Sequence, residues 1–127
     1  MDLKLKGRRA LVSGSSSGIG EGVARMLAQE GCAVVVHGRN RERAEKVAAD
    51  IKAAGVAIGD LSTDEGAAAV HAEARTALGG NIEILVNNAG GSSTGNTTKT
   101  PIQISAADFV SNYHTNMLAS EIGRAHV

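Results

Sequence analysis

Apolar runs and amphipathic stretches alternate regularly along most of the chain. The runs, each short and rich in aliphatic side chains, lie at residues 10–12, 33–36, 56–58 and 82–86 and predict four buried strands. The stretches between them carry apolar residues at helical spacing, as segment 44–51 does. Strands that alternate with helices of about 12 to 15 residues need crossover connections. The pattern therefore predicts an α/β fold with a parallel sheet covered by helices.

Capping signals mark where the predicted helices begin and end. Gly31 follows the first helix, at a position that favours a left-handed C-terminal cap. Asn40 is a favourable N-cap for the second helix, and Gly55 is expected to end it. The run from Ser62 to Glu65 has the form of a capping box, which predicts that Ser62 caps the third helix.

A glycine-rich turn joins the first strand to the first helix. Its glycines, Gly14, Gly18 and Gly20, let backbone amides and the positive end of the helix approach a phosphate group. The helix itself is predicted from an apolar stripe of Ile19, Val23, Met26 and Leu27. Glycines at such a turn also serve close packing alone. Their place between a strand and a helix favours a dinucleotide site.

Polar residues and glycines follow each predicted strand. In a parallel sheet with right-handed crossovers, the carboxyl ends of the strands border one crevice, where ligands bind. The pairs at this edge are Ser13-Gly14, His37-Gly38, Gly59-Asp60 and Asn87-Asn88. We therefore expect one ligand site along the carboxyl edge of the sheet.

Three segments together resemble the short-chain dehydrogenase/reductase family. They are Ser13 to Gly20, Asp60-Leu61-Ser62 and Asn87-Asn88-Ala89-Gly90, in the family's order and at its separations, with Ser13 in place of the usual threonine. The resemblance implies a Rossmann-like doubly wound parallel sheet, of which residues 1–120 hold only the N-terminal half as a partial NAD(P)-binding domain. Residues 5–12 and the following turn are most similar to the 3-oxoacyl-carrier-protein reductase branch.

The resemblance also implies roles for individual residues. The pyrophosphate would lie against the glycine turn, which supplies Gly14, Ser16, Ser17, Gly18, Ile19 and Gly20. Asp60 would accept a hydrogen bond from the adenine amino group, and Leu61 would line the adenine pocket. From the residues alone, Asp60 also fits a cap of its loop or of the helix that follows.

The segment after the fourth strand is expected to border the other half of the cofactor. By the resemblance, Asn87, Ala89 and Gly90 would lie beside the ribose and the nicotinamide. From the residues alone, Asn87 and Asn88 also fit backbone support of the strand end, a role that is compatible with binding.

The end of the second strand bears on the choice of cofactor. NAD sites usually place an acidic residue there to hold the ribose hydroxyls, whereas the 2′-phosphate of NADP needs a cation. Here the chain has Arg39 and no acid at this place, so we predict a preference for NADP, with NAD as the alternative. The other interpretation of Arg39 is a solvated residue at the start of a helix.

The same resemblance implies hydride transfer between the nicotinamide and a carbonyl or alcohol carbon of a small molecule. Asn116 matches the family's asparagine that supports a proton-relay water. The family's catalytic serine is absent. Its Tyr-x-x-x-Lys motif is also absent, because the single tyrosine, Tyr113, is followed four residues later by Met117. We therefore expect residues 1–127 to be inactive alone. The alternatives are a non-catalytic nucleotide-binding fragment and a methyltransferase on a similar sheet.

Composition narrows the expected partners and location. Thirteen basic and thirteen acidic residues balance, which argues against nucleic acid and anionic membranes as partners. The single cysteine, Cys32, favours a reducing compartment, and we expect a cytoplasmic protein. Four scattered histidines suggest no metal site. By the resemblance, the full-length protein is expected to be a homo-oligomer.

The last residues, 121–127, are expected to be a non-native tail. Segment 122–127 matches the peptide that a common DNA-sequencing adapter encodes in one reading frame. We therefore hypothesise that the natural protein continues after about Ser120.

Overall fold

Strands and helices alternate through residues 2–90, the part of the chain that the computed structural model describes. The elements are β1 (Arg9–Val12), α1 (Gly18–Gln29), β2 (Ala33–Gly38), α2 (Arg41–Ile51), β3 (Gly55–Ile58), α3 (Asp64–Leu78) and β4 (Ile84–Val86). The strands form one parallel sheet in the order β3-β2-β1-β4. This arrangement confirms the predicted Rossmann-like α/β fold.

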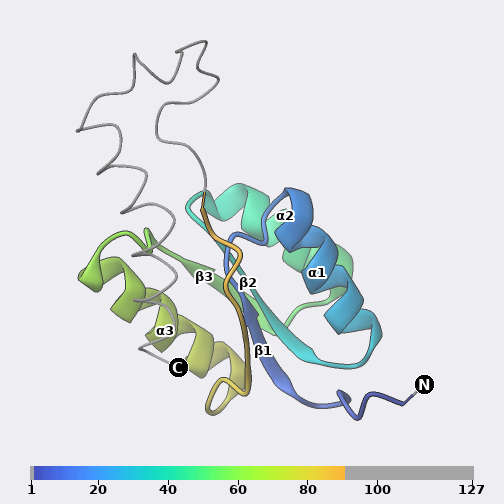
Figure 1. The fold of residues 1–127 in the computed structure, drawn as a ribbon. Helices are drawn as coiled ribbons and strands as arrows, with labels where there is room; N and C mark the ends of the chain where they lie inside the picture. The colour runs from blue at the N-terminus through green and yellow to red at the C-terminus, as the bar shows by residue number, and fades with distance from the viewer. Residues whose placement is uncertain (1, 91–127) are drawn as a thin grey trace, which may run out of the picture.

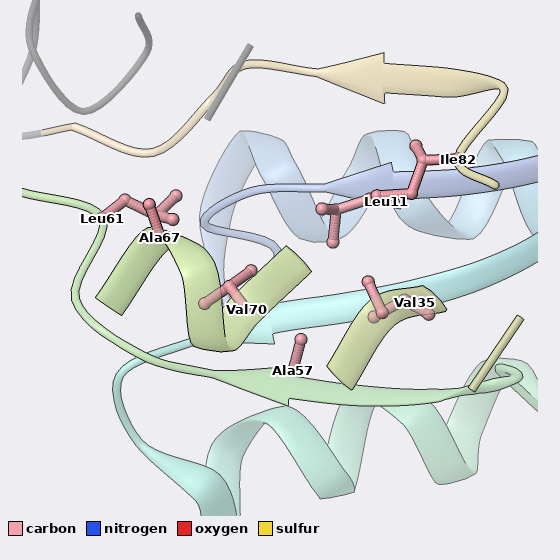
Figure 2. Packing of buried hydrophobic residues seen from close by; sticks show 8 residues of the cluster. Leu11, Val35, Ala57, Leu61, Ala67, Val70 and Ile82 are labelled. Atoms are coloured by element: carbon pink, nitrogen blue, oxygen red, sulfur yellow. The ribbon is translucent and has the colours of Figure 1, made fainter. Parts of the chain in front are cut away.

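Alternating side chains of the strands face opposite layers of helices. Figure 1 shows α1 and α2 on one face of the sheet and α3 on the other. Ala10, Val12 and Val34 pack with Ala24 of α1, while Val36 packs with α2. The opposite face forms what we call the α3 cluster, which consists of Leu11, Val35, Ala57, Leu61, Ala67, Val70, Ala74 and Ile82 (Figure 2). Both faces are therefore covered, as a parallel sheet requires.

The register of the sheet aligns the carboxyl ends of the strands. Val12 lies opposite Val36 in β2 and opposite Val86 in β4, and Val36 lies opposite Val56 in β3. The residues that follow the strands are thus brought to one edge. Within the described part of the chain, no helix is long and apolar enough to cross a membrane.

Strand β3 lies at one margin of the described sheet. The Glu73 side chain of α3 reaches this strand, and its carboxylate accepts a hydrogen bond of 3.0 Å from the backbone N–H of Ile58. A backbone donor on the outer side of β3 is thereby occupied by the protein itself.

Two of the predicted helix boundaries are wrong. Thr63, not Ser62, caps α3, because its hydroxyl oxygen accepts from the Gly66 N–H at 3.0 Å while the Ser62 hydroxyl donates to Asp60. Helix α2 ends at Ile51, its C-cap residue Lys52 adopts a left-handed conformation with φ of 54°, and Gly55 instead begins β3. Local hydrogen bonds override the simpler pattern in both places.

Two other capping predictions are confirmed. The Asn40 side-chain oxygen accepts from the Arg43 N–H at 3.0 Å, which caps α2. Gly31 has φ of 91° just after α1, as a left-handed cap position requires.

The predicted apolar stripe of α1 is only half correct. Val23 and Leu27 pack against the sheet, but Ile19 is 80% exposed and Met26 is 67% exposed. The fully buried positions of α1 are instead the small residues Gly20 and Ala24. Small residues suit this face because α1 lies close to the glycine turn.

Candidate functional site

Ser13 joins the carboxyl ends of β1 and β4. Its hydroxyl is buried, donates to the Val86 carbonyl at 3.2 Å, and accepts from the N–H groups of Asn88 and Ala89 at 2.9 Å each. Its own N–H also donates to the Val86 carbonyl at 3.0 Å. One hydroxyl therefore fixes the backbone of the Asn87–Gly90 segment beside the glycine turn.

Asn88 and Gly20 both lie against the Gly14 carbonyl of the glycine turn. The Asn88 side-chain amide donates to the Gly14 carbonyl at 3.1 Å. A Cβ added at Gly20 would overlap both the Gly14 carbonyl oxygen and the Asn88 amide. Gly14 itself has φ of 64° and lies against Ala89. Gly14 and Gly20 therefore serve close packing, the alternative that the sequence left open, and this packing shapes the turn.

Gly18 differs from these two glycines. It has φ of 60°, and a Cβ added there would meet nothing within 4 Å. Ser17 occupies the N-cap position of α1 without a side-chain hydrogen bond, whereas Asn40 and Thr63 cap α2 and α3 with their side chains. The start of α1 thus offers an open turn and first-turn N–H groups without a side-chain acceptor, an arrangement suited to an anion.

The His37 imidazole links the glycine turn to the end of β3. Its Nδ1 accepts from the Gly14 N–H at 2.8 Å, and its Nε2 lies 2.9 Å from the Gly59 carbonyl oxygen. Since Nδ1 accepts, the neutral ring carries its proton on Nε2 and donates it to Gly59. The side chain is nearly fully buried, and burial lowers the pKa of His37 below its ordinary value of 6.5.

Arg39 follows β2 at the edge of the same site. A Cβ added at Gly38 would lie 2.8 Å from the Ser16 hydroxyl oxygen, so the glycine turn touches the backbone next to Arg39. Arg39 is exposed and forms no ion pair with another described residue, whereas Arg41 pairs with Glu45 at 3.5 Å. The Arg39 guanidinium, which lies next to the glycine turn, is therefore available to an anionic ligand.

Asp60 and Leu61 follow β3. One Asp60 carboxylate oxygen accepts from the N–H and the hydroxyl of Ser62, at 2.9 and 2.7 Å, and these bonds lower the pKa of Asp60. Asp60 thus caps its own loop, while its second oxygen forms no hydrogen bond with the described residues. Leu61 is only 7% exposed and belongs to the α3 cluster, so little of its side chain faces the edge of the sheet.

The remaining predicted residues divide into two groups. Asn87 and Gly90 are exposed after β4, and Ala89 is partly buried against the α3 cluster. Asn116 lies outside the described residues, so its expected place is not seen. Among residues 2–90, no group of three or more potential ligand side chains could hold a metal ion.

Two residues with structural roles in the site, Ser13 and His37, received no individual role from the sequence, whereas Asn88 was expected to support the backbone of the strand end. Ser13, His37 and Asn88 were placed at the carboxyl edge, but their hydrogen bonds depend on the spacing of neighbouring strands. A polar side chain at the end of an apolar run was the available signal. The hydrogen-bond partners of these side chains lie 22 to 76 residues away in the sequence, beyond the reach of local patterns.

Comparison with known proteins agrees with this geometry. The family model for short chain dehydrogenase matches residues 8–123. An uncharacterized oxidoreductase of Bacillus subtilis, YvrD, is 43% identical over 71% of this chain and 35% of its own length. The 3-oxoacyl-[acyl-carrier-protein] reductase FabG of Aquifex aeolicus is 42% identical over 71% of this chain and 38% of its own length.

Solved structures show the same fold. L-sorbose reductase from Gluconobacter frateurii, in complex with NADPH and L-sorbose, matches with a TM-score of 0.88 and 29% identity, over 100% of this chain and 48% of that protein. The 3-ketoacyl-(acyl-carrier-protein) reductase from Brucella melitensis, in complex with NADH, matches with a TM-score of 0.85 and 30% identity, over 95% and 49%. The chain thus spans between a third and a half of these relatives. It belongs to the short-chain dehydrogenase family.

Proposed function

We propose that this chain forms the cofactor-binding part of an oxidoreductase that prefers NADP. The observation that carries the proposal is the open turn at Gly18 in front of the uncapped start of α1. In this proposal the pyrophosphate lies against Ser16, Ser17, Gly18 and Ile19, where backbone N–H groups and the helix dipole favour negative charge. Gly14 and Gly20 shape the turn through close packing against Ala89 and Asn88.

Arg39 and Ser16 support the choice of NADP over NAD. Arg39 follows Gly38 in the sequence, and the Ser16 side chain lies against Gly38 in space. Residues 37–40 contain no carboxylate that would hold a ribose hydroxyl or repel a phosphate. An exposed guanidinium can bind a 2′-phosphate through two parallel hydrogen bonds. NAD remains the alternative cofactor.

The other half of the proposed site follows β3 and β4. The second carboxylate oxygen of Asp60 is available to the adenine amino group, and Leu61 would contribute the small exposed part of its side chain. Asn87, Ala89 and Gly90 would border the ribose and nicotinamide, in a backbone shape that Ser13 fixes. In this proposal these residues bind and orient the cofactor, and the nicotinamide supplies the hydride chemistry when it is bound.

For the whole protein we propose reduction of a carbonyl, or oxidation of an alcohol, on a small molecule in the cytoplasm. The acyl-carrier-protein reductases from Aquifex aeolicus and Brucella melitensis, to which this chain is similar, support a reductase role. Asn116 is the proposed support of a proton relay, and a homo-oligomer is the proposed assembly. We expect residues 1–127 alone to bind cofactor without turnover, because the sequence has no Tyr-x-x-x-Lys motif.

The cofactor proposal is tested by titrating the chain with NADPH and NADH and measuring the fluorescence of the bound nicotinamide. We expect Arg39→Ala to weaken NADPH binding about tenfold to a hundredfold, as loss of a hydrogen bond to a charged group does. NADH binding should be almost unchanged. Arg43→Ala, which removes the same charge from α2, is the matched control and should alter NADPH binding about twofold or less.

Two results would count against the proposal. Equal NADPH affinity in Arg39→Ala and the unmodified chain, or tighter binding of NADH than of NADPH, would overturn the NADP preference. Absence of binding by both nucleotides to the folded chain would overturn the cofactor site itself.

A further inference from the structure

A buried titratable side chain lies at the centre of the candidate site. His37 is 3% exposed, and each of its polar atoms has a partner. Its backbone N–H donates to the Ser15 hydroxyl at 2.9 Å, and its carbonyl accepts from the Ser15 N–H at 2.8 Å. The ring adds one bond to Gly14 and one to Gly59. One residue therefore connects the carboxyl ends of β1, β2 and β3.

These connections reach three parts of the proposed cofactor site. Gly14 opens the turn that would hold the pyrophosphate, and Gly59 directly precedes Asp60. Gly38 lies between His37 and Arg39 in the sequence, and it packs against the Ser16 side chain. The position of the imidazole thus affects the spacing between the phosphate-binding turn, the cation and the carboxylate.

Given the proposed cofactor site, we infer that His37 is a positioning residue whose neutral imidazole sets the distance between the glycine turn and the end of β3, so that dinucleotide affinity decreases when this ring is protonated. The physical reason lies at Nδ1. A proton there would point at the Gly14 N–H, so that two donors would face each other and the bond to Gly14 would be lost.

Charged groups around His37 come from two loops. Arg39, after β2, disfavours the imidazolium, and Asp60, after β3, favours it. The turn after β1 contributes only neutral residues from Ser13 to Gly20, and the first turn of α3 carries exposed Asp64 and Glu65. A bound pyrophosphate would by itself attract the imidazolium, so electrostatic attraction alone would tighten dinucleotide binding when His37 is protonated. Loss of the bond to Gly14 is expected to weaken binding instead.

The test measures NADH binding by the chain between pH 7.5 and 5.5. NADH is the probe because the 2′-phosphate of NADPH would itself titrate near pH 6, as phosphate monoesters do. We expect the dissociation constant to rise as the pH falls toward the lowered pKa of His37, by up to about fivefold for the fully protonated ring, which is the effect of losing about one hydrogen bond. Circular dichroism at each pH verifies that the chain stays folded.

Two variants separate the bonds of the ring. In His37→Asn, the side-chain oxygen can replace Nδ1 as acceptor for Gly14, whereas in His37→Gln the amide can replace Nε2 as donor to Gly59. We expect both variants to lose the pH dependence of NADH binding. At pH 7.5, His37→Asn should bind NADH more tightly than His37→Gln, because it keeps the bond to the glycine turn.

A measurement on the unmodified chain covers the case in which a variant does not fold. The His37 ring nitrogens are titrated by nitrogen-15 NMR with and without NADH. Because linkage is reciprocal, we expect NADH to lower the pKa of His37. A pKa that rises or stays constant on binding, or the same pH dependence in His37→Asn, would overturn the positioning role. Failure of NADH and NADPH to bind at pH 7.5 would instead overturn the proposed function.

Discussion

At the scale of single residues, the candidate site depends on side chains that face the backbone. Ser13, Asn88 and His37 direct their polar atoms to main-chain groups of a neighbouring strand end. No buried side-chain nitrogen or oxygen among the described residues lacks a hydrogen-bond partner. Because a buried polar group without a partner is costly, each of these side chains stabilises one particular backbone geometry.

Ser13 provides a direct test of this dependence. Ser13→Ala would leave the N–H groups of Asn88 and Ala89 without their acceptor, so we expect the free energy of unfolding to fall by about 1–3 kcal/mol. Ser13→Thr keeps the hydroxyl and is the matched control, with stability close to that of the unmodified chain. Urea denaturation measures both variants. Equal stability of the two variants would show that the hydroxyl does not hold this segment.

At the scale of elements, the packing of α1 against the glycine turn depends on a glycine at the point of contact. Gly20 and Gly22 lie two residues apart on this helix, but only Gly20 faces the turn. The turn backbone and Asn88 occupy the space that a side chain at Gly20 would need. A Cβ at Gly22 would meet nothing within 4 Å.

This difference predicts opposite effects for the same substitution in α1. Gly20→Ala should lower the free energy of unfolding by about 1–3 kcal/mol, because the new methyl group overlaps backbone that must shift. Gly22→Ala should raise it by about 0.5–1 kcal/mol, since alanine favours the helix and the site is open. Thermal unfolding compares the two. A Gly20→Ala chain as stable as Gly22→Ala would contradict the tight packing described for Gly20.

The elements were largely predictable from the sequence, and the contacts between them were not. The strands and helices follow hydrophobic periodicity, which is local, and the run from Val34 to Val36 is as buried as expected. The caps at Ser62 and Gly55 were wrong because Asp60 and Lys52 adopt local structures that compete with the simple pattern. The role of His37 depends on Gly14 and Gly59, which only the folded sheet brings together.

At the scale of the whole molecule, the buried imidazole links folding to pH. The pKa of His37 is lowered in the folded chain by burial, from an ordinary value of 6.5. Above pH 6.5 both the folded and the unfolded chain hold a neutral ring, so His37 adds no pH dependence there. Below pH 6.5 the unfolded chain takes up the proton first, and the folded chain is destabilised until the pH passes its own lower pKa.

The unfolding free energy should therefore decrease as the pH falls below about 6.5, with a slope from His37 of at most about 1.4 kcal/mol per pH unit. Urea denaturation between pH 7.5 and 5 measures this slope. In His37→Asn the slope should be smaller by the His37 contribution, while the other three histidines are unchanged. An identical slope in both chains would mean that His37 does not titrate differently on folding.

The hydrogen bond between Glu73 and the Ile58 N–H has a consequence for crowded solutions. An edge strand can pair with a strand of another molecule, because its backbone N–H and C=O groups on that side are unpaired. Here the α3 carboxylate occupies one of the donors along β3, and it brings a negative charge to that margin. A second copy approaching the end of β3 would meet an occupied donor and a like charge, so α3 also disfavours intermolecular strand pairing at this margin.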